Sequence, residues 1–209
     1  MNLAEPYDFV MSRSTAAVLR VLIGAQTSFS IRQIARIAEI SVPQALRVID
    51  HESDRGLVLV EHAGRARMCR FNKDHLAANA IVELLTLRER MINVIRDEIS
   101  TWVIKPLHSS LFGSAARGGG GTESDLDVLV VRPEDVSENE WERQKYASGL
   151  NLKKKIGNTV SWFDISLAEM TNAKKAAEPF FSEWAKDGIS LTESSLLNLL
   201  SVNKSKAQK

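Results

Sequence analysis

The feature that most constrains this chain is an apolar strand that runs through a glycine-rich turn into a second strand headed by two carboxylates. The first strand ends at Leu111-Phe-Gly113, and the second runs from Asp125-Leu-Asp127 into Val-Leu-Val-Val131. Alternate side chains of a strand share a face, so Asp125 and Asp127 point the same way and the apolar residues between them point to the core. The pattern therefore predicts a sheet that presents paired carboxylates beside a glycine turn.

Paired carboxylates of this kind favour a metal site. Two carboxylates that converge repel each other unless a cation lies between them. Hard oxygen ligands suit Mg²⁺, which keeps waters and substrate phosphate oxygens as its remaining ligands. Gly113 allows close approach of the backbone, and the Ser114 hydroxyl with neighbouring amides can hold a polyphosphate. We therefore expect Mg²⁺ and a phosphate-bearing substrate at this turn.

The spacing Gly-Ser-x-x-Arg-Gly followed by Ser-Asp-x-Asp resembles the DNA polymerase β nucleotidyltransferase superfamily, and within it the minimal nucleotidyltransferases. The resemblance covers about residues 105–170. It implies a transfer of a nucleoside monophosphate from a nucleoside triphosphate, assisted by two Mg²⁺ ions, with release of pyrophosphate. On this interpretation two carboxylates bind both metals and four further residues bind the nucleotide: Asp125 and Asp127, then Gly113, Ser114, Arg117 and Ser124.

The family pattern needs a third carboxylate on a later strand. Residues 159–167 alternate as a strand should, with Phe163 and Ile165 on one face and Asp164 on the other. We expect Asp164 to complete the second metal site and to help deprotonate the acceptor hydroxyl. The alternative is a degenerate site that binds nucleotide without turnover. Four consecutive glycines, Gly118–Gly121, add a loop that is costly to order until a ligand or partner fixes it.

The amino-terminal half predicts three short helices and a hairpin. Ser30-Ile-Arg-Gln33 and Ser41-Val-Pro-Gln44 both fit capping boxes, and Val42, Leu46 and Ile49 have the spacing of a buried helix face. This order resembles the winged helix-turn-helix fold of bacterial regulators, over about residues 12–75. The residues that carry the likeness are 34–38, 41–49 and 55–58.

A winged helix-turn-helix implies binding to nucleic acid, and duplex DNA is the favoured ligand. Gln44 and Arg47, near the start of the third helix, would contact base edges in the major groove. Arg65, Arg67 and Arg70 of the hairpin would contact phosphates or the minor groove. The net charge of +1 gives no global support for this interpretation. The alternative is a module for protein docking or dimerisation.

The expected fold class is α+β, with a DNA-binding domain over residues 1–75, a linking helix over 76–103 and a nucleotidyltransferase domain with a small mixed sheet and a helical tail over 104–209. No stretch of the 209 residues has the roughly 18 apolar residues of a membrane span. The amino terminus lacks the features of a signal peptide. The single cysteine, Cys69, excludes an internal disulfide. We therefore expect a cytoplasmic protein without a membrane partner.

These patterns predict an enzyme: a Mg²⁺-dependent nucleotidyltransferase that moves a nucleoside monophosphate from an NTP to a protein or RNA acceptor, coupled to a DNA-binding module. Resemblance to minimal nucleotidyltransferases implies a bacterial toxin–antitoxin or defence setting, with a cognate toxin or antitoxin protein or a tRNA as the acceptor and autoregulation through DNA. A homodimer is a further expected partner. The alternative is a transcription regulator whose nucleotidyltransferase fold senses nucleotide without catalysis. An aminoglycoside acceptor is disfavoured by the basic run Lys153–Lys155.

Overall fold

The computed structural model describes residues 1–64, 66–176, 178–193 and 196–199. The chain divides into two compact units. The first unit is Glu5–Leu87, and the second unit combines Met1–Ala4 with Arg88–Lys209. These limits differ from the expected boundaries near residues 75 and 103. Each unit has its own core, and the residues expected to form one linking helix are divided between the two cores.

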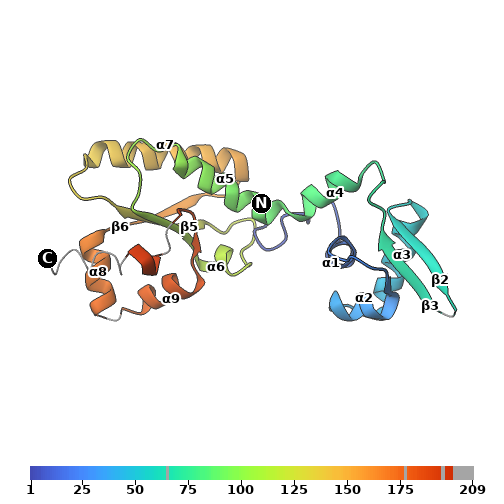
Figure 1. Ribbon diagram of the computed structural model, residues 1–209. Helices are drawn as coiled ribbons and strands as arrows, with labels where there is room; N and C mark the ends of the chain where they lie inside the picture. Colours follow the sequence, from blue (N-terminus) through green and yellow to red (C-terminus); the bar gives the residue numbers. More distant parts are fainter. Residues whose placement is uncertain (65, 177, 194–195, 200–209) are drawn as a thin grey trace. The chain divides into compact units, whose positions relative to one another are not determined.

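The first unit packs helices onto a small antiparallel sheet in the order β1-β3-β2 (Figure 1). Both predicted capping boxes form, at the starts of α2 and α3. Its core is apolar and includes Leu19, Leu22, Ile34 and Ile49. Along the chain its elements are α1 (Arg13–Ile23), β1 (Phe29–Ser30), α2 (Ile31–Ile37), α3 (Val42–Asp54), β2 (Val58–Ala63), β3 (Ala66–Phe71) and α4 (Ala78–Leu85).

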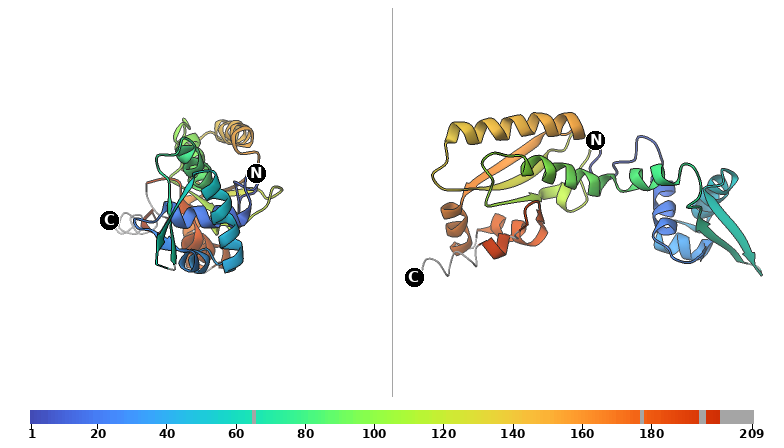
Figure 2. Two further views of the ribbon diagram at one scale, coloured as in Figure 1. Left: turned by 90° about the vertical axis from the view of Figure 1, so that its right-hand side faces the viewer. Right: turned by 45° about the horizontal axis from the view of Figure 1, so that its top comes forward.

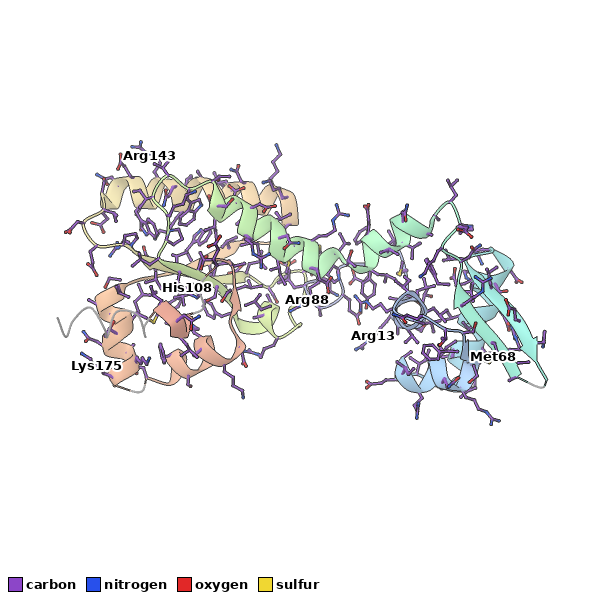
Figure 3. The ribbon with its side chains drawn as sticks, viewed as in Figure 1. Arg13, Met68, Arg88, His108, Arg143 and Lys175 are labelled. Atoms are coloured by element: carbon purple, nitrogen blue, oxygen red, sulfur yellow. The ribbon has the colours of Figure 1, made fainter. Side chains whose placement is uncertain are left out.

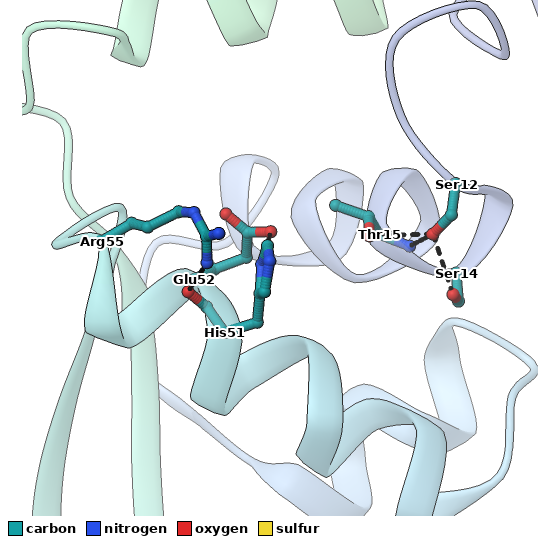
Figure 4. A network of polar contacts seen from close by, with 6 residues as sticks. All are labelled: Ser12, Ser14, Thr15, His51, Glu52 and Arg55. Carbon is teal, nitrogen blue, oxygen red and sulfur yellow. Dashed lines mark hydrogen bonds and ion pairs between the residues drawn. The ribbon is translucent and has the colours of Figure 1, made fainter.

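Of the three residues that the sequence predicts on the buried face of α3, Ile49 is buried and the other two are not. Val42 and Leu46 are 44% and 37% exposed, whereas Ala45, Val48 and Ile49 are buried. The buried stripe therefore follows the spacing 45, 48, 49 and 52, and it ends at Glu52, whose carboxylate accepts a hydrogen bond from His51 Nδ1 at 2.8 Å (Figure 4). Both stripes have helical spacing, so periodicity alone did not distinguish them.

The second unit is built on a mixed sheet in the order β6-β5-β4-β7. Strands β4 and β5 are antiparallel, whereas β5 and β6 are parallel. A parallel pair needs a long crossover, and α7 supplies it. The elements are α5 (Leu87–Ser100), β4 (His108–Phe112), α6 (Gly113–Ala116), β5 (Leu126–Arg132), α7 (Glu138–Ile156), β6 (Val160–Ser166), α8 (Leu167–Lys175), α9 (Pro179–Asp187) and β7 (Ile189–Ser190).

Helices cover both faces of this sheet. Figures 1 and 2 show α5 and α7 along one face, and α8 and α9 along the other. Val128 and Val130 pack with Trp141 of α7 in one apolar cluster. Leu129 and Val131, which alternate with them along β5, belong to a separate cluster with Met170, Phe181 and Trp184. Apolar residues on a strand of this sheet therefore do not reveal which face they occupy.

The segment expected as one linking helix forms two helices. α4 ends at Leu85 and α5 begins at Leu87. Between them the Thr86 hydroxyl donates to the carbonyls of Val82 and Glu83, a local bond by which threonine competes with a continuing helix. Ala78 and Leu85 of α4 pack in the first unit's core. Among the described residues, no helix is both long and apolar enough to cross a membrane.

Candidate active site

Gly113 and Asp127 form the centre of the predicted site. Phe112, the last residue of β4, pairs with Asp127 in the antiparallel ladder. Gly113 then turns the chain into α6 with a φ of 69°, a conformation that side chains other than glycine rarely adopt. A β-carbon at Gly113 would lie under 3.0 Å from Asp127 Oδ2. The absence of a side chain at this position is therefore what allows the carboxylate to sit against the turn.

The two neighbouring carboxylates make this corner electrostatically unfavourable without a cation. Partial burial raises the pKa of Asp127, the charge of Asp125 raises that pKa further, and the charge of Arg117 opposes both. Asp125 is exposed, and its Oδ2 accepts a hydrogen bond from Ser161 Oγ at 3.3 Å. Oxygen ligands that repel each other at the end of a strand fit a divalent cation such as Mg²⁺.

Asp164 does not join these carboxylates. In the parallel pair of β5 and β6, Asp127 lies opposite Ser161, and Asp164 lies opposite Val130. Neighbouring residues of paired strands share a face, so Asp164 is on the face of Val130, away from Asp127. There its Oδ2 accepts hydrogen bonds from Trp141 Nε1 at 2.6 Å and Lys145 Nζ at 2.7 Å. The geometry thus corrects the expectation that Asp164 is the third member of the site.

The error has a physical cause. The alternation along β6 was predicted correctly, but Phe163 was taken to face a core that lies opposite the carboxylates. Phe163 instead lies on the carboxylate face, where its ring contacts Phe112 and Trp184 at centroid distances of 5.8 and 5.3 Å. The residue that β6 brings beside Asp127 is Ser161, and no local pattern selects it before the strand register is known.

The glycine-rich loop is folded by its own backbone. Gly119 N donates to Ser114 O at 2.8 Å. Gly121 N donates to Ser124 Oγ at 2.9 Å, so that the Ser124 side chain closes the loop. Arg117, which is half-exposed, lies 3.7 Å from Asp187 of α9. Ser114, Arg117 and Ser124 are thus gathered around the turn that precedes Asp125.

The residues expected to contact DNA have several partners within the first unit. Gln44 Oε1 accepts hydrogen bonds from Ser41 in the capping box. Arg67 pairs with Asp50 of α3 at 2.6 Å, and Arg70 lies 3.6 Å from Glu61 across the hairpin. Arg47 is exposed, and its Nε donates to Pro43 O at 3.4 Å. Arg65, the fifth expected contact, lies outside the described residues.

Within the described ranges, no group of three or more His, Cys, Asp or Glu side chains is arranged to hold a metal ion. Residues 92–168, which include β4, β5 and β6, match the family model described as "Nucleotidyltransferase domain". Over these residues the chain is similar to nucleotidyltransferase domains. The matched range includes Gly113, Asp125 and Asp127.

Two solved structures resemble part of this chain at low identity. One is the crystal structure of a toxin–antitoxin with AMP-PNP, with 18% identity over 56% of this chain and 86% of that chain and a TM-score of 0.38. The other is a mutant of the toxin–antitoxin MntA–HpeT, with 18% identity over 58% of this chain and 86% of that chain and a TM-score of 0.35. No curated protein matches the chain.

Proposed function

We propose that this chain is a Mg²⁺-dependent nucleotidyltransferase that binds a nucleoside triphosphate at Asp125 and Asp127 and moves its nucleoside monophosphate to a protein or RNA acceptor. The observation that carries the proposal is the pair of carboxylates held against Gly113 inside the nucleotidyltransferase domain. Partial burial and the neighbouring Asp125 disfavour the negative charge of Asp127 and raise its pKa, and a bound cation would stabilise that charge.

The residues around Gly113 would divide the binding of Mg²⁺ and the triphosphate between them. Asp125 and Asp127 would hold Mg²⁺, which when bound neutralises the triphosphate and polarises the phosphate that is attacked. The Ser161 hydroxyl orients Asp125 through their hydrogen bond. Arg117, beside Asp127, would contact a phosphate oxygen. Ser114 and Ser124 shape the loop on which the triphosphate would lie.

For the first unit we propose a winged helix-turn-helix that binds DNA. Support comes from the order of its helices and hairpin, and from the exposed arginine Arg47 on α3. Arg67 and Arg70 would have to exchange Asp50 and Glu61 for phosphates on binding. Such exchange makes the affinity depend on salt, since each phosphate contact releases counterions.

A second candidate function is favoured by one observation. Asp164 lies on the opposite face of the sheet, so the acceptor hydroxyl lacks the carboxylate that was expected to deprotonate it. A nucleotidyltransferase fold that binds Mg²⁺ and nucleotide without transfer would make the chain a nucleotide-sensing transcription regulator. The two functions share the nucleotide site and differ in turnover.

Label transfer separates the two functions. The protein is incubated with Mg²⁺, each α-³²P-labelled nucleoside triphosphate in turn, and a cell lysate as the acceptor pool. Products are divided into protein, RNA and small-molecule fractions. Label that enters one fraction and disappears with Asp125→Ala supports the transferase and identifies its donor and acceptor class. Nucleotide binding without label transfer from any donor contradicts the transferase and supports the sensing regulator.

A further inference from the structure

The amino-terminal segment packs on the glycine-rich loop of the nucleotidyltransferase domain. Residues Met1–Ala4 belong to the second unit, although the residues that follow them belong to the first. Leu3 is completely buried. Ala4 N donates to Gly120 O at 2.9 Å, and a β-carbon at Gly120 would lie 3.2 Å from Leu3 Cδ1. The segment therefore fixes Gly120 by a hydrogen bond on the backbone and by apolar contact.

Arg88 holds the other end of the same loop. It lies near the start of α5, where the chain returns to the second unit (Figure 3). Its Nη2 donates to Ala115 O at 3.0 Å and to Ala116 O at 2.8 Å. Its Nε is 4.0 Å from the place where Gly118 would carry a β-carbon. One guanidinium thus fixes the turn that leads into Gly118.

Asn158 is a third contact on this loop and links it to the amino-terminal segment. Its side chain is buried at 2% exposure. Asn158 Nδ2 donates to Thr122 O at 3.2 Å and to Ser124 O at 3.0 Å, while Oδ1 accepts from the nitrogen of Met1 at 2.9 Å. Contacts from outside the loop therefore reach it at both ends and in its middle.

We propose that Leu3 and Arg88 are positioning residues for the nucleotide: they hold the loop 113–124 in the conformation that receives the triphosphate. The proposal rests on the nucleotide site proposed above. A loop with four consecutive glycines loses much conformational entropy when it is ordered. Contacts that order it before binding remove that loss from the binding step and strengthen affinity.

Leu3 and Arg88 lie close to the two points at which the chain passes between its units. Both precede residue 92, where the family match begins, whereas Asn158 lies inside the matched range. The chain leaves the second unit after Ala4 and returns at Arg88. Each point at which the chain passes from one unit to the other is thus next to a contact with the glycine-rich loop.

The test compares three variants of the full chain. Leu3→Ala removes the apolar contact, and Arg88→Gln removes the guanidinium. Arg96→Gln is the matched control, because Arg96 lies on the same helix and donates to the carbonyl of Ser190, away from the loop. The dissociation constants of MgATP, MgCTP, MgGTP and MgUTP are measured for each, together with amide hydrogen exchange over 113–124.

We expect Arg88→Gln to raise the dissociation constant of the bound nucleotide roughly fivefold to tenfold, as loss of about one net hydrogen bond does. Leu3→Ala should also raise it, because a loop without its apolar contact must be ordered during binding. Exchange should accelerate over 113–124 and stay unchanged in β5. The maximal transfer rate at saturating nucleotide should change less than KM, and Arg88→Lys, which restores a donor, should recover affinity. Arg96→Gln should behave as the wild type.

Unchanged loop exchange in both variants, or faster exchange with unchanged nucleotide affinity, would overturn the positioning role. The exchange measurement needs no nucleotide, so it tests whether Leu3 and Arg88 order the loop even if the proposed nucleotide site fails. Failure of the site itself would be seen as absent binding in the wild type. If Leu3 and Arg88 do not position the loop, Leu3→Ala and Arg88→Gln will bind nucleotide with wild-type affinity.

Discussion

The two faces of one sheet place aspartates in opposite circumstances. On the face of β5 beside Gly113, Asp127 adjoins Asp125, and partial burial together with that neighbouring charge raises its pKa. On the other face, Asp164 accepts hydrogen bonds from Trp141 and Lys145. A partly buried carboxylate paired with a cation and a hydrogen-bond donor is a structural group, whereas a carboxylate held beside another carboxylate is a candidate ligand. Partners, and not residue type, distinguish the two.

The largest expected effect is on the face of Asp127. Asp127→Asn should reduce Mg²⁺-dependent transfer by about 100-fold or more, because it removes a charged metal ligand. The same change should raise the unfolding free energy of the metal-free protein by about 1 kcal/mol, because it relieves the repulsion from Asp125. Transfer assays and thermal unfolding in EDTA measure the two effects. A destabilised variant with normal transfer would remove the contrast between the two faces.

Gly113→Ala should reduce transfer by about 100-fold through geometry alone. The added β-carbon meets Asp127 Oδ2, and the backbone conformation with positive φ becomes strained. Gly121→Ala is the matched control, since a β-carbon there has open space. The measurement is kcat/KM for the donor identified by label transfer. Equal activity of the two variants would show that Asp127 does not need its place against the turn.

Asp164→Asn should have the opposite profile. Removing one charge from the pair with Lys145, whose side chain is 9% exposed, should lower the unfolding free energy by about 3 kcal/mol. Transfer per folded molecule should stay within about twofold of the wild type, because the side chain lies on the other face. Urea unfolding and active-site-normalised transfer measure this. A stable variant that has lost transfer would restore Asp164 to the site.

Ser161→Asp should increase the rate of nucleotide transfer. The residue lies opposite Asp127 in the parallel register, so a carboxylate there would join the pair. We expect the transfer rate to rise about tenfold with Mg²⁺, by analogy with the effect of a positioned general base. Ser161→Asn is the control of similar size without charge. Loss of transfer with Ser161→Asp, or an equal gain with Ser161→Asn, would show that a third carboxylate at this position does not assist transfer.

The smallest expected effect is a shift in the pH dependence of Mg²⁺ affinity. The pKa of Asp127 is raised in the folded state, so protonation of this group favours folding and opposes metal binding. As the pH falls, Mg²⁺ affinity should therefore weaken at a pH above the ordinary aspartate pKa of about 3.9. The metal-free protein should gain stability over the same interval. Mg²⁺ titrations across this pH range test the sign, and affinity constant down to pH 4 would contradict it.

The sequence was sufficient for local features and insufficient for those that depend on strand register. The Gly113 turn, the two carboxylates and the capping boxes at Ser30 and Ser41 are local, so spacing predicts them. The face of Asp164 depends on how β6 pairs with β5, and a sheet covered on both sides gives no polar face to orient it. The clamp by Leu3 joins distant parts of the chain, and no local pattern indicates it.

The most direct test of the central claim is Mg²⁺-dependent nucleotide binding by Asp127→Asn and Asp164→Asn, measured calorimetrically on folded protein with the wild type alongside. The two changes are chemically identical and lie on opposite faces of one sheet. We predict that Asp127→Asn loses Mg²⁺-dependent binding and that Asp164→Asn retains it. Retention by Asp127→Asn with loss by Asp164→Asn would place the nucleotide site on the other face and contradict the account.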